Sequence, residues 1–588
     1  MVKSKEPRRN VYVGHRYVPL IMGQWDKSIT YEGLSIVQHE GNSYTSKKHV
    51  PIGIDILNEE FWAVTGNYNA QIEDYRQEVR RLSTDVGNNS TTLIEHDTKI
   101  KSNTTNIATN KADIKKAEKN IDNIDQRVST VESLTDPNID KIDLSVPTDF
   151  NDLQSAVDYS LKLKQGIKVE ITMESGFKPS KGIYVEDQDA SFITISSIDD
   201  IVSVDTDYTG HFIHVYKGKA PVLNTLIDSR DIGGDGLRVM FSSSAVVNSQ
   251  CGVINAGGGG VYCRTSTITA PYSKFTGAND RAAWITRASN VSFAQADFSG
   301  VKQGAVGIYI SRASIGDFSD VTINDCKVTD WAIYVVRSKA NFINAQLNNS
   351  TGGGILATSN SQVVASEISA RNSGKTAVYA NRSSDINLGA NSDLSHAGVS
   401  GLQVVNNSKV NAIGLNVSNA GDRPLLVEAG SHVNITDGNG RVSKGNGVLI
   451  SGSVANIPGF VVSSANGVGL EVNSGSNVNF ENGFIQGVTG FGMDISHGSN
   501  VNARNALIEK TIALANTPES GTGVRVSYGS TLNLVTARVR NNELNDVNTR
   551  YGSTVSGNGL TTTNGKPELS DTNVTAFNTP SGRGIFYV

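Results

Sequence analysis

A repeat of about 23 residues covers more than half of this 588-residue chain, from about residue 236 to residue 570. Each copy opens with Gly, an apolar residue, any residue and a second apolar residue, and a Ser usually follows seven places after the Gly. The one long interval between copies contains an additional loop around Thr511–Gly521. The copies begin at Gly236, Gly260, Ala282, Gly307, Ala332, Gly354, Ala377, Gly401, Pro424, Gly447, Gly469, Gly492, Gly523 and Asp546.

The pattern inside each copy is typical of β-strands. Apolar residues two apart, such as Leu402 and Val404, fall on the same face of an extended strand. A second pair, such as Val478 and Phe480, follows a short polar turn. Because so short a unit can bury its inner face only against its neighbours, the repeat predicts a solenoid. Units rich in Gly, Asn, Ser and Val favour a mainly β fold, a right-handed parallel β-helix over residues 236–570.

A heptad pattern precedes the repeat, within residues 71–134. Its d positions include several Asn residues, and all nine of its a positions are apolar: Ile72, Val79, Val86, Leu93, Ile100, Ile107, Ile114, Ile121 and Val128. Nine heptads predict a helical rod of roughly 90 Å. Ile at a with Asn at d resembles the stalks of trimeric bacterial adhesins and phage fibres. We therefore expect a parallel trimeric coiled coil and a homotrimeric protein.

Residues 135–235 connect the heptads to the regular repeat. Asp136-Pro137 should end the heptad helix. A short amphipathic helix should follow, with Phe150, Leu153, Val157 and Leu161 on one face and Thr148 or Asp149 as N-cap. This helix would cover the open first coil, and irregular first coils would lead to residue 236. Residues 571–588 form the C-terminal end.

Residues 1–70 are aromatic, Gly-rich and without a repeat. Their characteristic short motifs are Tyr17-Val18-Pro19, Gly23-x-Trp25, Gly41-Asn42-Ser43-Tyr44, Val50-Pro51-x-Gly53 and Thr65-Gly66-Asn67-Tyr68-Asn69. The segment resembles the N-terminus of tail-fibre and neck-appendage proteins of small short-tailed phages that infect Gram-positive bacteria. The remainder resembles a pectate-lyase-like β-helix tailspike. The resemblance implies that residues 1–70 attach to tail, neck or collar proteins of the virion and that the distal modules contact the host.

Two columns of side chains emerge when the copies are aligned. The third residue of each copy lies between two inward residues and should face outward; we call this set the outward column. The sixth residue of each copy lies in the adjoining turn and forms the turn column. The outward column contains Tyr262, Trp284, Tyr309, Tyr334, Leu356 and Tyr379, and the turn column contains Arg287, Arg312, Arg337, Ser359 and Arg382.

These columns predict a ligand-binding groove about 25 Å long, since stacked strands lie about 4.8 Å apart. Aromatic faces stack on the apolar faces of sugars or polyols, and guanidinium groups pair with phosphate or carboxylate. An extended anionic glycopolymer fits both requirements. Two other interpretations stay open. The rings can form a cross-strand ladder with cation–π neighbours, or they can pack against another protomer of the trimer.

Glu471 and Asp494 are the candidate catalytic residues. They occupy the outward column on adjacent coils, so their carboxyl groups could act as the paired acid and base of a glycosidase. Two like charges that close would raise the pKa of one carboxyl. Solvated surface charge is the competing interpretation. A looser cluster of four acids is a weaker candidate for acid chemistry or cation binding: Asp317, Asp320, Asp325 and Asp330.

Bulk properties exclude several other classes of protein. The net charge of −5 argues against a nucleic-acid-binding surface, and no stretch approaches 18 apolar residues, so we expect no membrane span. The sequence from Met1 to Glu6 lacks an apolar region, which predicts synthesis in the host cytoplasm without a secretion signal. Three Cys residues suggest no disulfide framework, and no metal or cofactor motif is found.

These observations predict a virion protein, a phage tail fibre or appendage that adsorbs to cell-wall polysaccharide or teichoic acid of the host. Teichoic acid is favoured because its repeated phosphate matches a column of arginines. The alternative is an enzyme of the same architecture, a glycosidase or lyase that cleaves polysaccharide or teichoic acid during adsorption. A cellular adhesin is the third interpretation.

Overall fold

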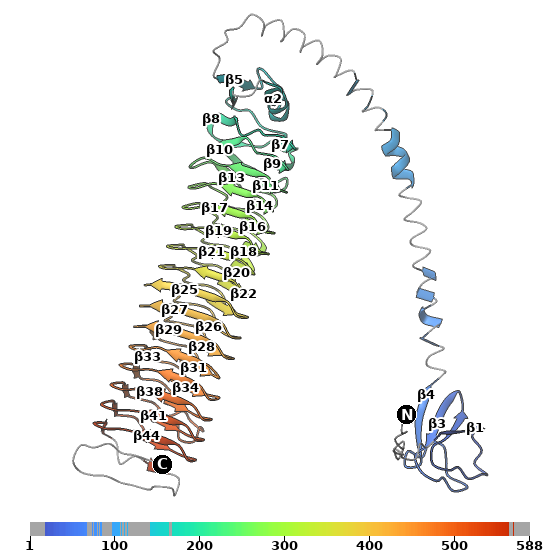
Figure 1. Ribbon diagram of the computed structural model, residues 1–588, viewed down its shortest axis with the longest axis vertical. Helices are drawn as coiled ribbons and strands as arrows, with labels where there is room; N and C mark the ends of the chain where they lie inside the picture. Colours follow the sequence, from blue (N-terminus) through green and yellow to red (C-terminus); the bar gives the residue numbers. More distant parts are fainter. Residues whose placement is uncertain are drawn as a thin grey trace, which may run out of the picture. The chain divides into compact units, whose positions relative to one another are not determined.

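The computed structural model describes residues 18–67, scattered helical residues between 73 and 115, and residues 141–163, 167–563 and 568–569. The chain forms two units, Met1–Pro137 and Asn138–Val588 (Figure 1).

The N-terminal unit contains a four-stranded sheet in the order β1 (Leu20–Gln24), β2 (Ser35–His39), β3 (Asn42–Ser46), β4 (Trp62–Asn67). The β1 strand pairs with β2 in parallel, and the remaining pairs are antiparallel. Glu40 and Gly41 join β2 to β3 with positive φ angles of 46° and 80°, as a two-residue hairpin turn requires. The buried core of this sheet contains Tyr31, Val37, Tyr44, Val50, Ile56 and Trp62.

The described residues between Glu73 and Lys115 are all helical and exposed. Ile100 is 61% exposed and Ile114 is 55% exposed, although the heptad pattern places both in a helix seam. The exposure of these two apolar residues in a single chain is what a helix that packs against other chains would show. The other a positions lie outside the described residues, so the trimeric coiled coil stays a prediction.

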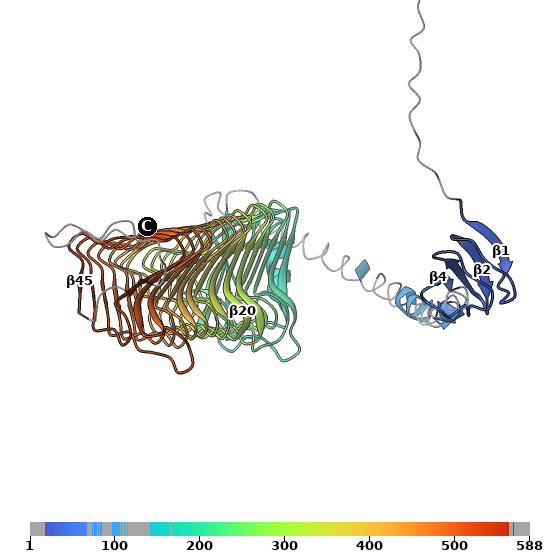
Figure 2. The ribbon, with the colours of Figure 1, turned by 90° about the horizontal axis from the view of Figure 1, so that it is seen from below.

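The second unit is a parallel β-solenoid of about 18 turns with about 23 residues per turn, which confirms the predicted mainly β solenoid. Successive coils follow similar outlines, each displaced a little from the one before, when the solenoid is seen from below (Figure 2). The described strands of the solenoid pair in parallel with strands of neighbouring coils. They form three long faces, which we call sheets A, B and C. The right-handed sense of the coil stays a prediction, and the strong preference of parallel crossovers for that hand supports it.

Sheet A carries the outward column. Its strands are β7 (Lys181–Glu186), β9 (Thr209–Tyr216), β11 (Leu237–Met240), β14 (Val261–Arg264), β16 (Ala283–Thr286), β18 (Gly304–Ser311), β20 (Val328–Val336), β22 (Gly353–Thr358), β24 (Val378–Asn381), β26 (Ser400–Val404), β28 (Arg423–Glu428), β31 (Val448–Ser451), β34 (Leu470–Asn473), β37 (Phe491–Ile495), β40 (Thr522–Val526), β43 (Val547–Thr549) and β46 (Glu568–Leu569).

Sheet B follows sheet A after the turn column. Its strands are β12 (Ser244–Val246), β15 (Thr267–Thr269), β17 (Asn290–Ser292), β19 (Ile315–Asp317), β21 (Lys339–Asn341), β23 (Gln362–Val364), β25 (Asp385–Ala390), β27 (Lys409–Ile413), β29 (His432–Thr436), β32 (Val454–Asn456), β35 (Asn477–Asn479), β38 (Asn500–Asn502), β41 (Thr531–Asn533) and β44 (Thr554–Ser556).

Sheet C is interrupted in the middle of the solenoid, where single β-bridges from Gly252 to Asn439 continue it. Its strands at the N-terminal end are β5 (Lys141–Val146), β6 (Lys168–Met173), β8 (Ile193–Ser203), β10 (Val222–Asp228) and β13 (Gly252–Ile254). Its strands at the C-terminal end are β30 (Asn439–Arg441), β33 (Val461–Ser463), β36 (Phe484–Gln486), β39 (Leu507–Glu509), β42 (Arg538–Arg540) and β45 (Thr561–Thr562).

The repeated Ser explains how the turn between sheets A and B is held. The buried Ser384 donates its backbone N–H to Oγ of Ser408 on the next coil at 3.2 Å, and Ser408 does the same to Ser431. Such bonds continue along most of the solenoid and satisfy buried backbone groups. The turn itself contains two successive residues with positive φ in most copies, such as Asn406 at 55° and Asn407 at 60°.

The three sheets enclose one apolar core that runs from Leu144 to Val555. Its N-terminal half contains a row of fully buried phenylalanines on successive coils, in which Phe293 stacks on Phe318 and Phe318 on Phe342 at centroid distances of 5.5 and 5.1 Å. All three cysteines, Cys251, Cys263 and Cys326, are buried free thiols.

A short helix, α2 (Leu153–Ser160), covers the first coil, at the top of the solenoid in Figure 1. Its buried residues Leu153, Ala156 and Val157 join the solenoid core, as the apolar face predicted. The predicted N-cap, Thr148 or Asp149, was wrong. The N-cap is Asp152, whose side chain accepts the Ser155 N–H, whereas the Asp149 carboxylate accepts the Ser145 N–H instead. Either Asp can cap a turn, and the path of the chain after β5 decides which one does.

Candidate functional site on sheet A

The outward column is a single register line along sheet A. Tyr262 pairs with Trp284, Trp284 with Tyr309, and Tyr309 with Tyr334. Leu356 and Tyr379 continue the line, and Glu471 and Asp494 are its members four and five coils farther on. The predicted alignment of the copies is therefore confirmed. The roles assigned to these residues stay predictions.

The rings of this column contact one another. Tyr262 meets Trp284 edge to face at 5.1 Å and 85°, and Tyr309 meets Tyr334 at 5.3 Å and 68°. Trp284 and Tyr309 lie 6.2 Å apart. All five predicted rings are half-buried, so part of each ring remains open to solvent. The rings thus form a cross-strand ladder, and the exposed part of the ladder is available for a ligand or another protomer.

Trp331 completes the ladder and was not predicted as a site residue. The outward column has an aliphatic residue at Leu356, which interrupts the series of rings. Trp331 lies across Gly353 of the next coil, where an added Cβ would approach the indole to 2.2 Å, and reaches Tyr379 at 5.9 Å. Trp331 stands directly before its repeat copy, so alignment to the copy start could not reveal it. The Gly352-Gly353-Gly354 run was the available signal.

Two arginines contact the first two rings of the ladder. The guanidinium of Arg238 lies 4.5 Å from the Tyr262 ring centroid, and that of Arg281 lies 4.5 Å from the Trp284 ring centroid. These are cation–π pairs. Both arginines also pair with acids, Arg238 with Asp235 and Arg281 with Asp280.

The four arginines of the turn column differ from Arg238 and Arg281, because none of the four has an ion-pair partner among the described residues. Arg287, Arg312, Arg337 and Arg382 are all exposed, and their φ angles are 60°, 58°, 50° and 50°. Other copies place Asn406 or Gly452 in this turn, residues that adopt left-handed φ more easily. Three of the arginines lie on successive coils, about 4.8 Å apart. A row of like charges without counter-charges is a surface that attracts an extended anion.

Local electrostatics connect the two columns. Burial raises the pKa of Tyr334 and Tyr379, and the positive charge of Arg382 acts in the opposite direction on both pKa values. At the other end of the column, burial lowers the pKa of His214 to about 4. The His214 ring lies 5.0 Å from Tyr184, and Arg238 separates it from Tyr262 along the same register line.

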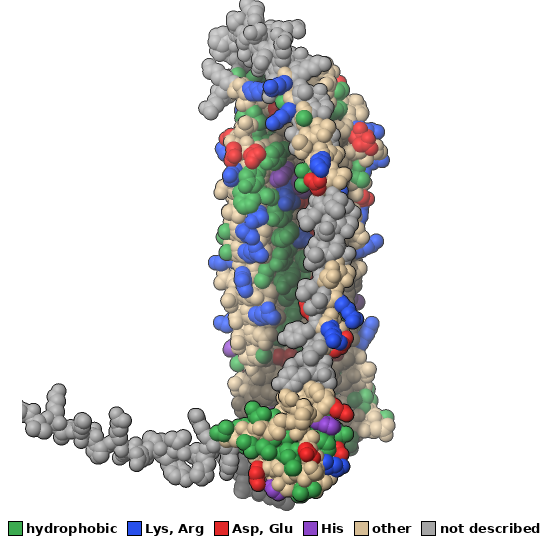
Figure 3. Space-filling model, turned by 90° about the vertical axis from the view of Figure 1, so that its right-hand side faces the viewer, with side chains coloured by type: hydrophobic (Ala, Val, Ile, Leu, Met, Phe, Trp, Pro, Cys, Tyr) green, Lys and Arg blue, Asp and Glu red, His purple; other side chains and the backbone are tan. Residues whose placement is uncertain are grey.

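The space-filling view agrees with this arrangement. A band of hydrophobic side chains runs along the solenoid, and Lys and Arg side chains lie along one side of the band (Figure 3). We call this set the aromatic–arginine surface: the outward-column rings Tyr262, Trp284, Tyr309, Tyr334 and Tyr379, with Trp331 and the turn-column arginines Arg287, Arg312, Arg337 and Arg382.

Glu471 and Asp494, the predicted catalytic pair, lie on adjacent coils of sheet A, and their catalytic role stays a prediction. Asp494 accepts two bonds from Arg525, one of them from Nε at 2.9 Å. Glu471 accepts from Arg423 at 3.5 Å and from Asn473 at 3.3 Å. Each carboxylate thus has its own guanidinium partner.

Each aspartate of the looser cluster has partners of its own. Asp320 accepts from Asn344, Asp325 accepts from Asn349, and Asp330 lies 3.7 Å from Lys375. Asp317 accepts hydrogen bonds from the side chains of Ser319 and Asn341. In the part of the chain that the structure describes, no group of three or more His, Cys, Asp or Glu side chains could hold a metal ion.

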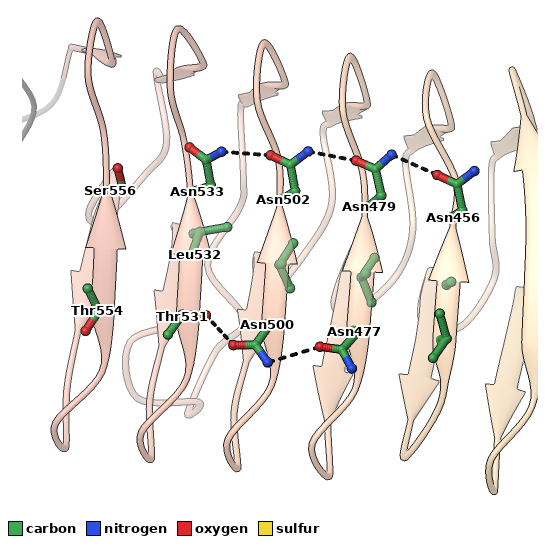
Figure 4. Close-up of a pocket in the computed structure, with 14 residues that line it drawn as sticks. Asn456, Asn477, Asn479, Asn500, Asn502, Thr531, Leu532, Asn533, Thr554 and Ser556 are labelled. Atoms are coloured by element: carbon green, nitrogen blue, oxygen red, sulfur yellow. Dashed lines mark hydrogen bonds between the residues drawn. The ribbon is translucent and has the colours of Figure 1, made fainter.

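Sheet B presents a different outer surface, formed by two rows of amide and hydroxyl side chains. Asn533, Asn502, Asn479 and Asn456 each donate to the asparagine of the preceding coil at 2.7–2.9 Å (Figure 4). A second row contains Asn477 and Asn500. A shallow trough of about 520 Å³ lies between the rows. Most amide groups in these ladders bind each other, so their first role is to hold successive coils in register.

Comparison with known proteins gives few similarities. No family model and no curated protein matches the chain. Among solved structures, the Acinetobacter phage vb_AbaP_AS12 gp42 tailspike is 11% identical with a TM-score of 0.26, over 76% of this chain and 68% of the tailspike. The PL6 family alginate lyase AlyGC is 10% identical with a TM-score of 0.23, over 73% of this chain and 100% of the lyase. At these scores neither similarity carries an argument about this chain.

Among the residues whose structure is described, no helix combines the length and apolarity needed to cross a membrane.

Proposed function

We propose that this chain is a phage tail fibre or appendage that adsorbs to an anionic glycopolymer of the host cell wall through the aromatic–arginine surface. The observation that carries the proposal is the coincidence of two columns over the same coils. One presents half-exposed aromatic rings, and the other presents exposed arginines that have no ion-pair partner among the described residues. Rings contact sugar or polyol carbons, and guanidinium groups bind the charges.

Teichoic acid is the favoured polymer because its phosphates recur along the chain, as the arginines recur along the solenoid. We infer that residues 1–70 bind the virion, that residues 71–134 form a trimeric stalk, and that the solenoid is presented to the host. The resemblance of residues 1–70 to phage appendage proteins supports this polarity. The hydrophobic core of residues 18–67 supports an independent attachment domain.

The test is co-sedimentation of the purified full-length chain with host cell walls, before and after chemical removal of teichoic acid. Binding should be lost with the polymer and should be inhibited by soluble polyglycerol phosphate. Residues 1–70 should compete with the full chain for particles that lack fibres. Full binding to walls without teichoic acid would contradict this choice of ligand.

A depolymerase of the same architecture is the second candidate, and one observation favours it. Glu471 and Asp494 line a common hollow near the C-terminal end of sheet A. Release of fragments from wall or capsule preparations would establish this activity. The pairing of both acids with arginines makes binding without cleavage the first proposal.

A further inference from the structure

A hollow of about 340 Å³ lies on the C-terminal coils of sheet A, about four coils beyond Tyr379. In this hollow the outward column carries charged residues and the turn column carries aromatic ones, the reverse of the aromatic–arginine surface. The outward column contains Glu471, Asp494 and Arg525, and the turn column contains His497, Tyr528 and Tyr551. We propose that this hollow is a second binding site, specific for a neutral saccharide unit. The proposal does not depend on the aromatic–arginine surface.

The turn column supplies an aromatic wall. His497 stacks on Tyr528 at 4.9 Å and 21°, and Tyr528 stacks on Tyr551 at 4.7 Å and 14°. Both tyrosines are 53% exposed. Their φ angles of 52° and 49° are unusual for a bulky side chain, and the same turn contains Gly452 in another coil. A wall of exposed rings suits the C–H face of a sugar ring.

The charges of the hollow are balanced, unlike those of the aromatic–arginine surface. Arg525 binds Asp494, and Arg423 binds Glu471. Arg550 binds Glu519, which also lies 3.9 Å from Arg525. Because every guanidinium has a carboxylate partner, the site offers no excess positive charge to an anion. Neighbouring donors and acceptors held in fixed positions are suited to the hydroxyl groups of a neutral sugar.

The additional loop in the long repeat interval supports this site from outside its lining. Asp494 and Arg525 are 31 residues apart, although they lie on adjacent coils, because the additional loop intervenes. Glu519 is in that loop. Ser520 holds the loop through bonds to the Leu514 and Thr517 carbonyls. The loop therefore places the acid that balances Arg550. Loops on a regular scaffold often carry binding residues.

The volume of the hollow limits the size of the ligand. A volume of about 340 Å³ is at the lower end of the range for small-molecule sites, which fits one or two sugar rings. Asn473, Ser496 and Ser527 add uncharged polar groups to its lining. If both sites bind one polymer, the gap of about 19 Å between Tyr379 and Glu471 would be spanned by intervening units, and the two sites would reinforce each other.

The experiment uses the full chain and an array of neutral oligosaccharides (gluco-, galacto- and N-acetylglucosamine series), with sulfated and phosphorylated counterparts. We expect at least one neutral series to bind, with an affinity that changes less than about twofold between low and high salt, since no net charge is involved. Tyr528→Ala and Tyr551→Ala should each weaken that binding about tenfold. Tyr272→Ala is the matched control, because Tyr272 is 45% exposed with a φ of 56° but does not line the hollow.

Three results would overturn the proposal. The first is no binding of any neutral series, the second is binding of the anionic series alone, and the third is neutral binding that survives both tyrosine substitutions. Trp284→Ala separates the two sites. It should reduce binding to polyglycerol phosphate and leave neutral binding unchanged, so each site can fail without the other.

Discussion

Replacement of Tyr309 by Ala separates the three interpretations of the aromatic ladder. The ring contacts Trp284 at 6.2 Å and Tyr334 at 5.3 Å, and part of its surface is open to solvent. Aromatic pairs contribute about 0.5–1.5 kcal/mol each, so the loss of two contacts should lower the free energy of unfolding by about 1–3 kcal/mol. The substitution removes no core side chain, because the ring faces outward between Ile308 and Ile310.

If the ladder binds polymer, the same substitution removes one stacking platform. Aromatic stacking on nucleic-acid bases is worth about 1–3 kcal/mol per ring, which corresponds to roughly a 5- to 150-fold weaker Kd. Tyr309→Phe retains the ring and should change neither quantity by much. The assays are polymer binding by calorimetry, denaturant unfolding and hydrogen exchange of β18 and its neighbours, and molecular mass by light scattering.

Each interpretation has its own result. Weaker binding of Tyr309→Ala at unchanged mass supports the ligand surface. A fall in unfolding free energy with polymer affinity unchanged within twofold would refute our reasoning and leave a structural ladder. Loss of the trimer, with or without an effect on binding, would identify a contact between protomers.

Four further predictions concern the turn-column arginines, the stalk, the two candidate catalytic acids and His214. Arg312→Gln with Arg337→Gln should weaken binding to polyglycerol phosphate and flatten its salt dependence, because these exposed charges have no ion-pair partner among the described residues and are screened by salt; an unaltered salt response would move the anion site elsewhere. The full chain should have about three times the 62.6 kDa monomer mass in solution. Deletion of residues 72–131 should weaken association, and a stable monomer of the full chain would exclude the trimer. If the protein cleaves its polymer, Glu471→Gln and Asp494→Asn should each abolish fragment release and leave binding at the aromatic–arginine surface nearly intact. Undiminished release by the double variant would remove both residues from the chemistry. Because the folded-state pKa of His214 is lowered to about 4, the unfolded chain binds more protons than the folded chain below about pH 6.5. The free energy of unfolding should therefore fall as the pH drops from about 6.5 toward 4, and His214→Phe should reduce that slope. An equal slope in both proteins would show that other groups dominate.

The period of the sequence determined the solenoid and the membership of its columns. Each strand in a stacked parallel coil pairs with the equivalent strand of the next copy, so residues at equal positions become neighbours wherever the copies are aligned correctly. Tyr309 and Tyr334, or Glu471 and Asp494, could therefore be paired from numbering alone. The buried Ser at the turn was visible for the same reason, since every coil must satisfy the same backbone groups.

Tertiary structure decided what the side chains in those columns do. A long side chain can reach a neighbour on its own coil, the next coil or an inserted loop, and the repeat does not specify which. Arg525 pairs with Asp494, Arg423 pairs with Glu471, and Glu519 reaches Arg550 from a loop outside the repeat. Trp331 joins the ladder because Gly353 leaves space for its ring. Sequence periodicity fixes the positions of backbones about 4.8 Å apart, whereas the choice among partners within reach depends on packing in three dimensions.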